Sequence, residues 1–98
     1  MPTASISIQI LPLNHNTKSS LLIIDSVISL IKKSGVNYEV GPMETTMEGD
    51  LDDLLEIVKK IEHLALKKSK GTVFTNLKII TAKKGVMTIE QKTKKHRI

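Results

Sequence analysis

The organisation of this chain is set by residues 38–50, which read Tyr38-Glu39-Val40-Gly41-Pro42-Met43-Glu44-Thr45-Thr46-Met47-Glu48-Gly49-Asp50. Alternation along Tyr38–Val40 and Glu44–Glu48 predicts two half-buried strands. Gly41-Pro42 separates them, because proline has no amide proton for a β-ladder and fixes its own φ. The second strand is rich in carboxylates and hydroxyls. These groups suit either a small polar ligand or a solvated hairpin whose acidic residues protect a sheet edge.

The residues before this stretch predict a strand, a helix and a second strand. Residues 4–10 alternate isoleucine with polar residues, which is typical of a strand with one apolar and one polar face. Asn16 or Thr17 is the expected cap of a helix that runs to about Ser34. Val36–Val40 then forms the second strand of the predicted order.

The residues after this stretch predict another helix and a last strand. Asp50 is a good N-cap for an amphipathic helix that Gly71 ends. Thr72–Thr81 is the predicted fourth strand, and Thr88–Lys95 a short final helix with Thr88 as its cap. On the fourth strand, the side chains expected to face the core are Val73, Leu77 and Ile79. Those expected on the other face are Phe74, Asn76, Lys78 and Ile80.

The order β-α-β-β-α-β predicts an α+β fold of the ferredoxin-like type. Both amphipathic helices need one shared apolar surface, and crossovers between parallel strands are right-handed. The solution is a four-stranded antiparallel sheet with two helices on one face. The second face then has no helix to cover it, so it meets water, a ligand or another subunit. A homo-oligomer formed through sheet faces or edges is therefore expected.

Length and charge indicate one domain with a basic end. The 98 residues suffice for a single core, so residues 1–98 are expected to be one domain. Residues 83–98 hold six lysine or arginine side chains and one glutamate, which accounts for the formal net charge of +5. A basic tail can attract nucleic acid, although a short one is more often a solvated end. Because the neutral body offers no extended basic surface, nucleic-acid binding stays an alternative to the main hypothesis.

The sequence carries few of the patterns that catalysis or metal binding requires. It has no cysteine, and the spacing of His15, His63 and His96 pairs no two of them as ligands. It contains no Gly-x-Gly-x-x-Gly motif, P-loop or nucleophile elbow. Glu44 and Glu48 are a candidate acid–base pair, but no partner nucleophile accompanies them. We therefore expect a non-catalytic protein with no metal and no cofactor.

Two further absences predict a cytoplasmic location. No apolar run reaches the length of a membrane span. Residues 1–5 lack the basic and apolar regions of a signal peptide. We therefore expect a protein that is not attached to a membrane.

Residues 38–50 also resemble the signature of a family of small thiamine-binding proteins, formerly uncharacterised, with archaeal, bacterial and yeast members. The similarity continues at Ser5–Leu13, at Lys78-Ile79 and at Thr88–Lys92, so it covers nearly the whole chain. The Gly-Pro-…-Thr-Thr-…-Glu-Gly block is fairly specific, while the flanking strand patterns are generic. The resemblance implies a ferredoxin-like fold, dimers or tetramers formed through sheets, and binding of thiamine or its hydroxymethylpyrimidine part without chemistry.

The resemblance also implies which residues bind that ligand. Carried over from the family motif, they are Pro42, Met43, Glu44, Thr45, Thr46 and Glu48. To these we add Ser7 and Gln9, because they lie on the polar face of the first strand. Alternation places Glu44, Thr46 and Glu48 on the face opposite Thr45, so a regular strand does not direct them all to one ligand. Either the strand bulges there or some of these residues serve a subunit contact.

Overall fold

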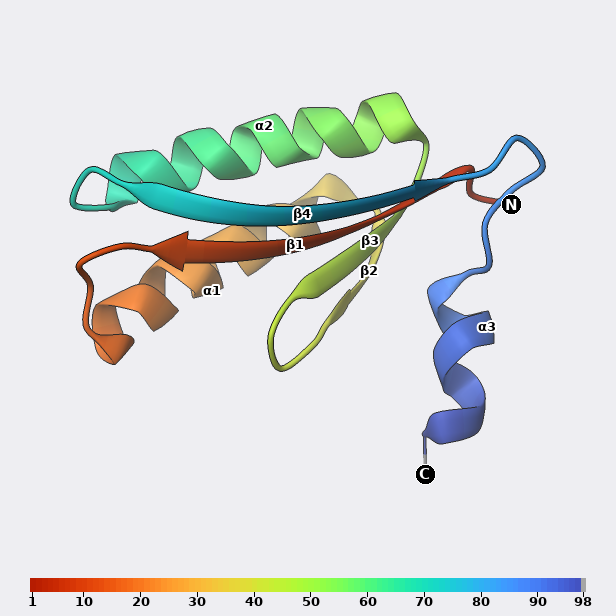
Figure 1. Ribbon diagram of the computed structural model, residues 1–98, viewed down its shortest axis with the longest axis horizontal. Helices are drawn as coiled ribbons and strands as arrows, with labels where there is room; N and C mark the ends of the chain where they lie inside the picture. The colour runs from red at the N-terminus through yellow and green to blue at the C-terminus, as the bar shows by residue number, and fades with distance from the viewer. Residues whose placement is uncertain (98) are drawn as a thin grey trace.

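The computed structural model describes residues 1–97, which form one β-sheet with two long helices and a short C-terminal helical segment (Figure 1). The elements in chain order are β1 Ala4–Pro12, α1 Thr17–Ser34, β2 Asn37–Val40, β3 Thr45–Gly49, α2 Leu51–Lys68, β4 Val73–Thr81, α3 Ile89–Thr93 and the 3₁₀ helix η1 Lys94–His96.

The sheet has four strands in the order β2-β3-β1-β4, and every neighbouring pair is antiparallel. β1 is therefore a central strand, with Ile8 paired to Thr45 on one side and to Leu77 on the other. With α1 and α2 in the two crossovers, this arrangement confirms the predicted α+β, ferredoxin-like βαββαβ fold.

The core lies between the sheet and the two long helices. The isoleucines of β1 alternate with polar residues, so all of them point to this side. Helical spacing directs one apolar stripe from each long helix onto them. The largest side chains that the fold buries completely are Ile6, Ile31, Met47, Leu54 and Ile61.

Capping side chains define the ends of the long helices. The Asn16 side chain accepts a hydrogen bond from the Ser19 amide at 2.8 Å, and Asp50 accepts from the amides that open α2. Both caps were predicted. The prediction that Gly71 ends the second helix is wrong, because Ser69 ends it first. The Ser69 hydroxyl donates to the Leu66 carbonyl at 2.8 Å and accepts from the Gly71 amide.

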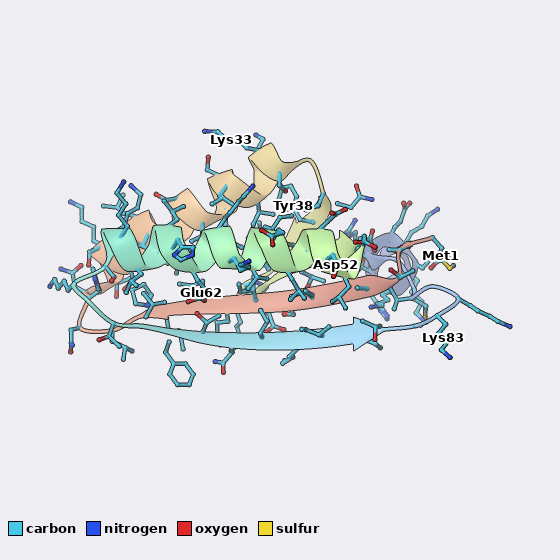
Figure 2. All side chains as sticks on the ribbon, turned by 90° about the horizontal axis from the view of Figure 1, so that it is seen from above. Met1, Lys33, Tyr38, Asp52, Glu62 and Lys83 are labelled. Carbon is cyan, nitrogen blue, oxygen red and sulfur yellow. The ribbon has the colours of Figure 1, made fainter. Side chains whose placement is uncertain are left out.

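β4 forms an outer edge of the sheet, and this changes the exposure of its apolar residues. Pairing with Ile8 and Ile6 puts Leu77 and Ile79 on the helix side, as predicted. They are nevertheless 37% and 48% exposed, so the expectation that they belong to the core is wrong. The reason is that β4 is the last strand of the sheet and lies at the margin of the helix layer, where α2 still reaches Thr75 through Glu62 (Figure 2).

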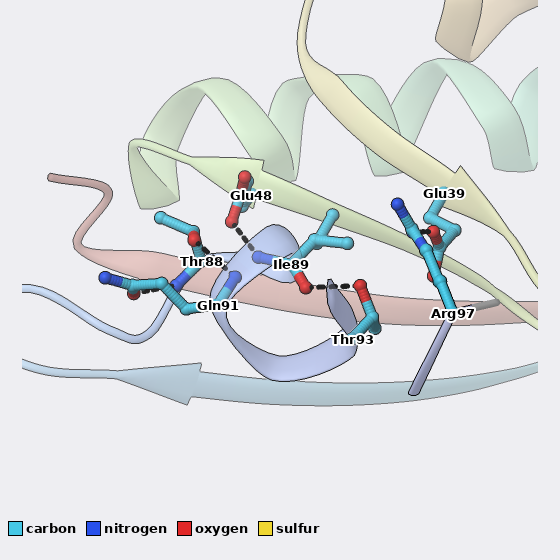
Figure 3. A network of polar contacts seen from close by, with 7 residues as sticks. All are labelled: Glu39, Glu48, Thr88, Ile89, Gln91, Thr93 and Arg97. Atoms are coloured by element: carbon cyan, nitrogen blue, oxygen red, sulfur yellow. Dashed lines mark hydrogen bonds and ion pairs between the residues drawn. The ribbon is translucent and has the colours of Figure 1, made fainter. Parts of the chain in front are cut away.

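The second sheet face is partly covered, which corrects the expectation that no helix lies on it. α3 packs where β2 and β3 meet, and Ile89 is buried there. Its amide donates to the Glu48 carboxylate at 2.8 Å (Figure 3). Thr88 caps α3 through a reciprocal capping box with Gln91, so the predicted short helix and its cap are confirmed.

Candidate ligand-binding site

A tight loop between β2 and β3 forms one wall of the candidate site. The Gly41 amide donates to the Glu44 carbonyl at 2.9 Å and closes the loop. A Cβ atom on residue 41 would lie 2.7 Å from that same carbonyl oxygen, so the loop requires glycine there. Met43 at its tip is 75% exposed. Because Glu44 belongs to the loop, β3 begins at Thr45, later than the predicted start at Glu44.

β3 directs its two threonines to opposite faces of the sheet, as the alternation predicted. Thr45 pairs with Ile8 and is buried on the helix side. Thr46 pairs with Ser7, and its side chain lies on the face opposite the long helices. Of the two, Thr46 is therefore the one that shares a face with the polar side chains of β1.

On this second face, beside the area that α3 covers, the sheet and the loop enclose an open hollow of about 560 Å³. That volume falls within the range of roughly 300–1,000 Å³ that small-molecule pockets occupy. The structure brings five of the predicted ligand-binding residues to it: Gln9, Pro42, Met43, Glu44 and Thr46.

Three polar residues that the sequence did not propose as ligand-binding also line the hollow. Asn76 and Lys78 come from β4, and Glu39 comes from β2. The polar alternation of β4 was visible in the sequence, but its pairing with β1 was needed to bring Asn76 opposite Gln9. Glu39 also forms an ion pair with Arg97, so the C-terminal segment reaches the rim of the hollow (Figure 3).

The polar groups of the hollow offer both donors and acceptors. The Asn76 side-chain amide donates to the Gln9 side-chain oxygen at 3.0 Å, which leaves the Gln9 NH₂ group and the Asn76 oxygen for other partners. The Lys78 ammonium lies 3.5 Å from the Glu44 carboxylate. This long, largely exposed pair is weak, so a ligand can replace it at little cost.

Ser7 has an unusual environment at the floor of this face. It pairs with Thr46 on one side and with Lys78 on the other, and both of these line the hollow. Its hydroxyl oxygen is buried, yet among residues 1–97 it has no hydrogen-bond partner. Buried polar groups without partners are rare and costly, and this one lies between Thr46 and Lys78, two residues that line the hollow, without lining it itself.

The remaining two predicted site residues lie elsewhere. Thr45 is on the helix side of the sheet. Glu48 does share the face of Thr46, but it is only 8% exposed and its carboxylate accepts the Ile89 amide beneath α3. The structure therefore places six of the eight candidates in or beside the hollow and two outside it.

The histidines and acids of the described chain do not form a metal site. Across residues 1–97, no three His, Asp or Glu side chains gather closely enough to hold an ion. His15 has a structural position: its Nδ1 atom lies 2.9 Å from the Ser19 hydroxyl, and its Nε2 atom accepts from the Lys70 amide at 3.0 Å. Within the same range, no helix has the length and hydropathy that crossing a bilayer requires.

Comparison with known proteins places this chain in a family. The family model described as thiamine-binding protein matches residues 6–97. A UPF0045 protein of Clostridium perfringens is 46% identical over 99 residues, with 99% of this chain and 100% of that protein covered. The chain therefore belongs to the thiamine-binding protein family.

Solved structures agree with this assignment. A Thermotoga maritima protein, described as a candidate thiamine biosynthesis/salvage protein, is similar with a TM-score of 0.84 and 32% identity. The alignment covers 98% of this chain and 100% of that one. A Streptococcus pneumoniae protein matches with a TM-score of 0.82 and 33% identity, over 94% of this chain and 98% of the other.

Proposed function

We propose that this protein reversibly binds thiamine or a related hydroxymethylpyrimidine compound in the hollow beside the 41–44 loop, and that it catalyses no reaction. The observation that carries the proposal is the convergence of Gln9, Thr46 and Asn76 in one hollow next to the unpartnered Ser7 hydroxyl. Membership of the thiamine-binding protein family supports the choice of ligand.

The chemistry of the hollow matches an aminopyrimidine ring. Such a ring presents nitrogen acceptors and an exocyclic amine donor. The Thr46 hydroxyl and the free NH₂ group of Gln9 can donate to the ring nitrogens, while the Asn76 oxygen can accept from the amine. Burying these groups against the ligand gives orientation and specificity.

The walls of the hollow supply the apolar contact that a flat heterocycle needs. Pro42 and Met43 supply it from the loop, whereas Leu77 borders the hollow but directs its side chain to the helix side of the sheet. Methionine adapts to an irregular ring surface and makes favourable sulfur–aromatic contacts. Met43 is largely exposed, so covering it with a ligand removes apolar surface from water.

A binding role, as a carrier, buffer or sensor in the cytoplasm, fits the hollow better than catalysis. Its acids are Glu39, paired with Arg97, and Glu44, close to Lys78. The only amine near either acid is the Lys78 ammonium, whose side chain is largely exposed to solvent, so the hollow shows no activated nucleophile among residues 1–97. In this role the single domain of residues 1–98 acts without a cofactor.

We further propose that the protein works as a homo-oligomer, a dimer or a tetramer. β4 exposes apolar side chains on both of its faces: Phe74, Leu77, Ile79 and Ile80. An edge strand of this kind offers unpaired backbone groups and apolar surface to a second copy. This exposed surface also favours the alternative to ligand binding, which is a role in protein–protein interaction without a small-molecule ligand.

Titration calorimetry with hydroxymethylpyrimidine, thiamine and thiamine diphosphate tests the proposed function. We expect at least one of them to bind with a dissociation constant below about 1 mM, a free energy of roughly 4 kcal/mol. If none binds that tightly, the ligand proposal fails and the interaction role replaces it.

A further inference from the structure

The helix layer carries a groove of its own, across the sheet from the hollow beside the 41–44 loop, which we call the first hollow. The volume of the groove is about 540 Å³, within the range of roughly 300–1,000 Å³ that small-molecule pockets occupy. Every residue that lines it comes from α1 or α2. Because these helices pack side by side over the sheet, the groove follows the seam between them (Figure 2).

The floor of this groove is apolar. Ile57 is buried, and Leu30 of α1 and Leu64 of α2 are half-buried. Each of the three leaves part of its surface open to the groove. A ligand that covers them removes apolar area from water, so the floor favours a molecule with an apolar part over a bare inorganic ion.

The rim of the groove is positive. Lys33 of α1 and Lys60 of α2 line it, and no acidic residue of the described chain lines it with them. Neither lysine forms an ion pair within residues 1–97, whereas the adjacent Lys59 pairs with Glu56 at 3.2 Å. Two cations from different helices that face one groove favour a negatively charged group.

Small serine side chains of α1 leave room in the groove and supply a hydrogen-bond donor. Ser26 donates to the Leu22 carbonyl at 3.1 Å, so its hydroxyl hydrogen is already engaged. Ser29 is exposed and lies one helical turn before Lys33, on the same side of α1. Its hydroxyl can therefore donate to an anion that this lysine holds.

We propose that this groove binds a small organic anion, a molecule with an apolar body and one carboxylate, sulfonate or phosphate group. The body lies on the leucines and the isoleucine of the floor. The anionic group lies between Lys33 and Lys60, within reach of the Ser29 hydroxyl. The groove is separate from the first hollow, so this inference goes beyond the proposed function and does not rest on it.

Three probes of matched structure test the ligand class. The dye 8-anilinonaphthalene-1-sulfonate has an aromatic body and a sulfonate, N-phenyl-1-naphthylamine has the same body without the sulfonate, and inorganic sulfate is an anion without the body. Fluorescence titration of the full chain measures both dyes, and displacement of the sulfonate dye at constant ionic strength measures sulfate. We expect the sulfonate dye to bind about fivefold or more tighter than the neutral dye, and sulfate to bind more weakly than either.

Neighbouring lysines provide a matched control for charge. The double variant Lys33→Gln/Lys60→Gln removes both cations of the groove. The double variant Lys32→Gln/Lys59→Gln lowers the net charge by the same amount at adjacent exposed positions outside the groove. We expect the first to weaken binding of the sulfonate dye about fivefold or more, and the second to change it by less than about twofold.

Two leucines of α2 test the floor in the same way. Leu64 lines the groove, whereas Leu66 lies outside it and is 52% exposed. Leu64→Gln weakens binding of the sulfonate dye about threefold or more, and Leu66→Gln leaves it nearly unchanged. Thermal unfolding of each variant checks that the fold is retained. In the wild type, the amide chemical shifts that the dye changes most lie in residues 26–34 and 57–64.

The opposite results overturn the inference. Equal loss of affinity in the two double variants reflects net charge rather than this groove. A neutral dye that binds as tightly as the sulfonate dye shows that the lysines contribute nothing, and sulfate that binds as tightly as the dye shows that the floor contributes nothing. Chemical-shift changes confined to the exposed apolar residues of β4 place the dye on that surface instead, and a wild type that binds no dye has no such site.

Discussion

The Glu48 carboxylate accepts a hydrogen bond from the backbone amide of Ile89 at 2.8 Å, and this contact fastens α3 to the sheet. The two residues are far apart in the chain, and both are buried. A glutamate that the family resemblance implies for ligand binding therefore has a structural partner in this protein. Glu48 therefore holds α3 on the sheet, whereas Thr46 lines the hollow, although both side chains lie on the same face of β3.

Replacing Glu48 tests this structural role. Glu48→Ala removes the acceptor of the Ile89 amide, and leaving a buried donor unpaired costs about 1–3 kcal/mol. We expect faster hydrogen exchange at the α3 amides and a lower free energy of unfolding, with little change in hydroxymethylpyrimidine affinity. A large loss of affinity with unchanged exchange in α3 would instead make Glu48 a ligand contact.

Thr46 is expected to behave in the opposite way. Thr46→Val keeps the shape of the side chain and removes the hydroxyl that faces the first hollow. If this hydroxyl bonds the ligand, calorimetry will show hydroxymethylpyrimidine binding weakened by about 1–3 kcal/mol. Thr81→Val, the same change at an exposed position on β4, is the control and should leave affinity unchanged. Equal affinity in both variants would remove Thr46 from the site.

The exposed apolar residues of β4 predict self-association. In analytical ultracentrifugation at micromolar concentration we expect a dimer or tetramer, held by apolar contact on or beside this strand. Phe74→Glu places a charge on the second face and should lower the measured mass if the faces pack together. An unchanged mass would indicate pairing through strand edges, and a wild-type monomer would contradict the oligomer proposal.

Removal of residues 94–98 tests the alternative role of the basic tail. The truncation deletes the Arg97–Glu39 ion pair, which is partly exposed, and pairs of this kind contribute about 0–1 kcal/mol. We expect nearly unchanged thermal stability and no measurable duplex binding at physiological salt with or without the tail. Tight binding that falls steeply with added salt and disappears on truncation would support the nucleic-acid alternative.

Periodic patterns predicted most of this fold because local rules determine it. The alternation of residues 4–10 and the caps Asn16, Asp50 and Thr88 correspond directly to observed elements. The exposure of Leu77 and Ile79 was not predictable from alternation. Alternation gives the face of a strand, whereas burial also depends on whether the strand lies in the middle of the sheet or at its edge, as β4 does.

The site was only partly predictable for a similar reason. Alternation separated Thr45 from Thr46, and the polar face of β1 indicated Ser7 and Gln9. The contributions of Asn76 and Glu39 depend on the pairing of strands distant in sequence. The contact between Glu48 and α3 depends on where a short terminal helix docks, which no pattern within β3 encodes.

A crystal structure of the protein with bound hydroxymethylpyrimidine tests the central claim most directly. The account predicts the ring in the first hollow, against Pro42 and Met43, with hydrogen bonds to Thr46 and to Gln9 or Asn76. A ring bound on the helix side of the sheet, under α3 or at a subunit contact remote from the loop would contradict it.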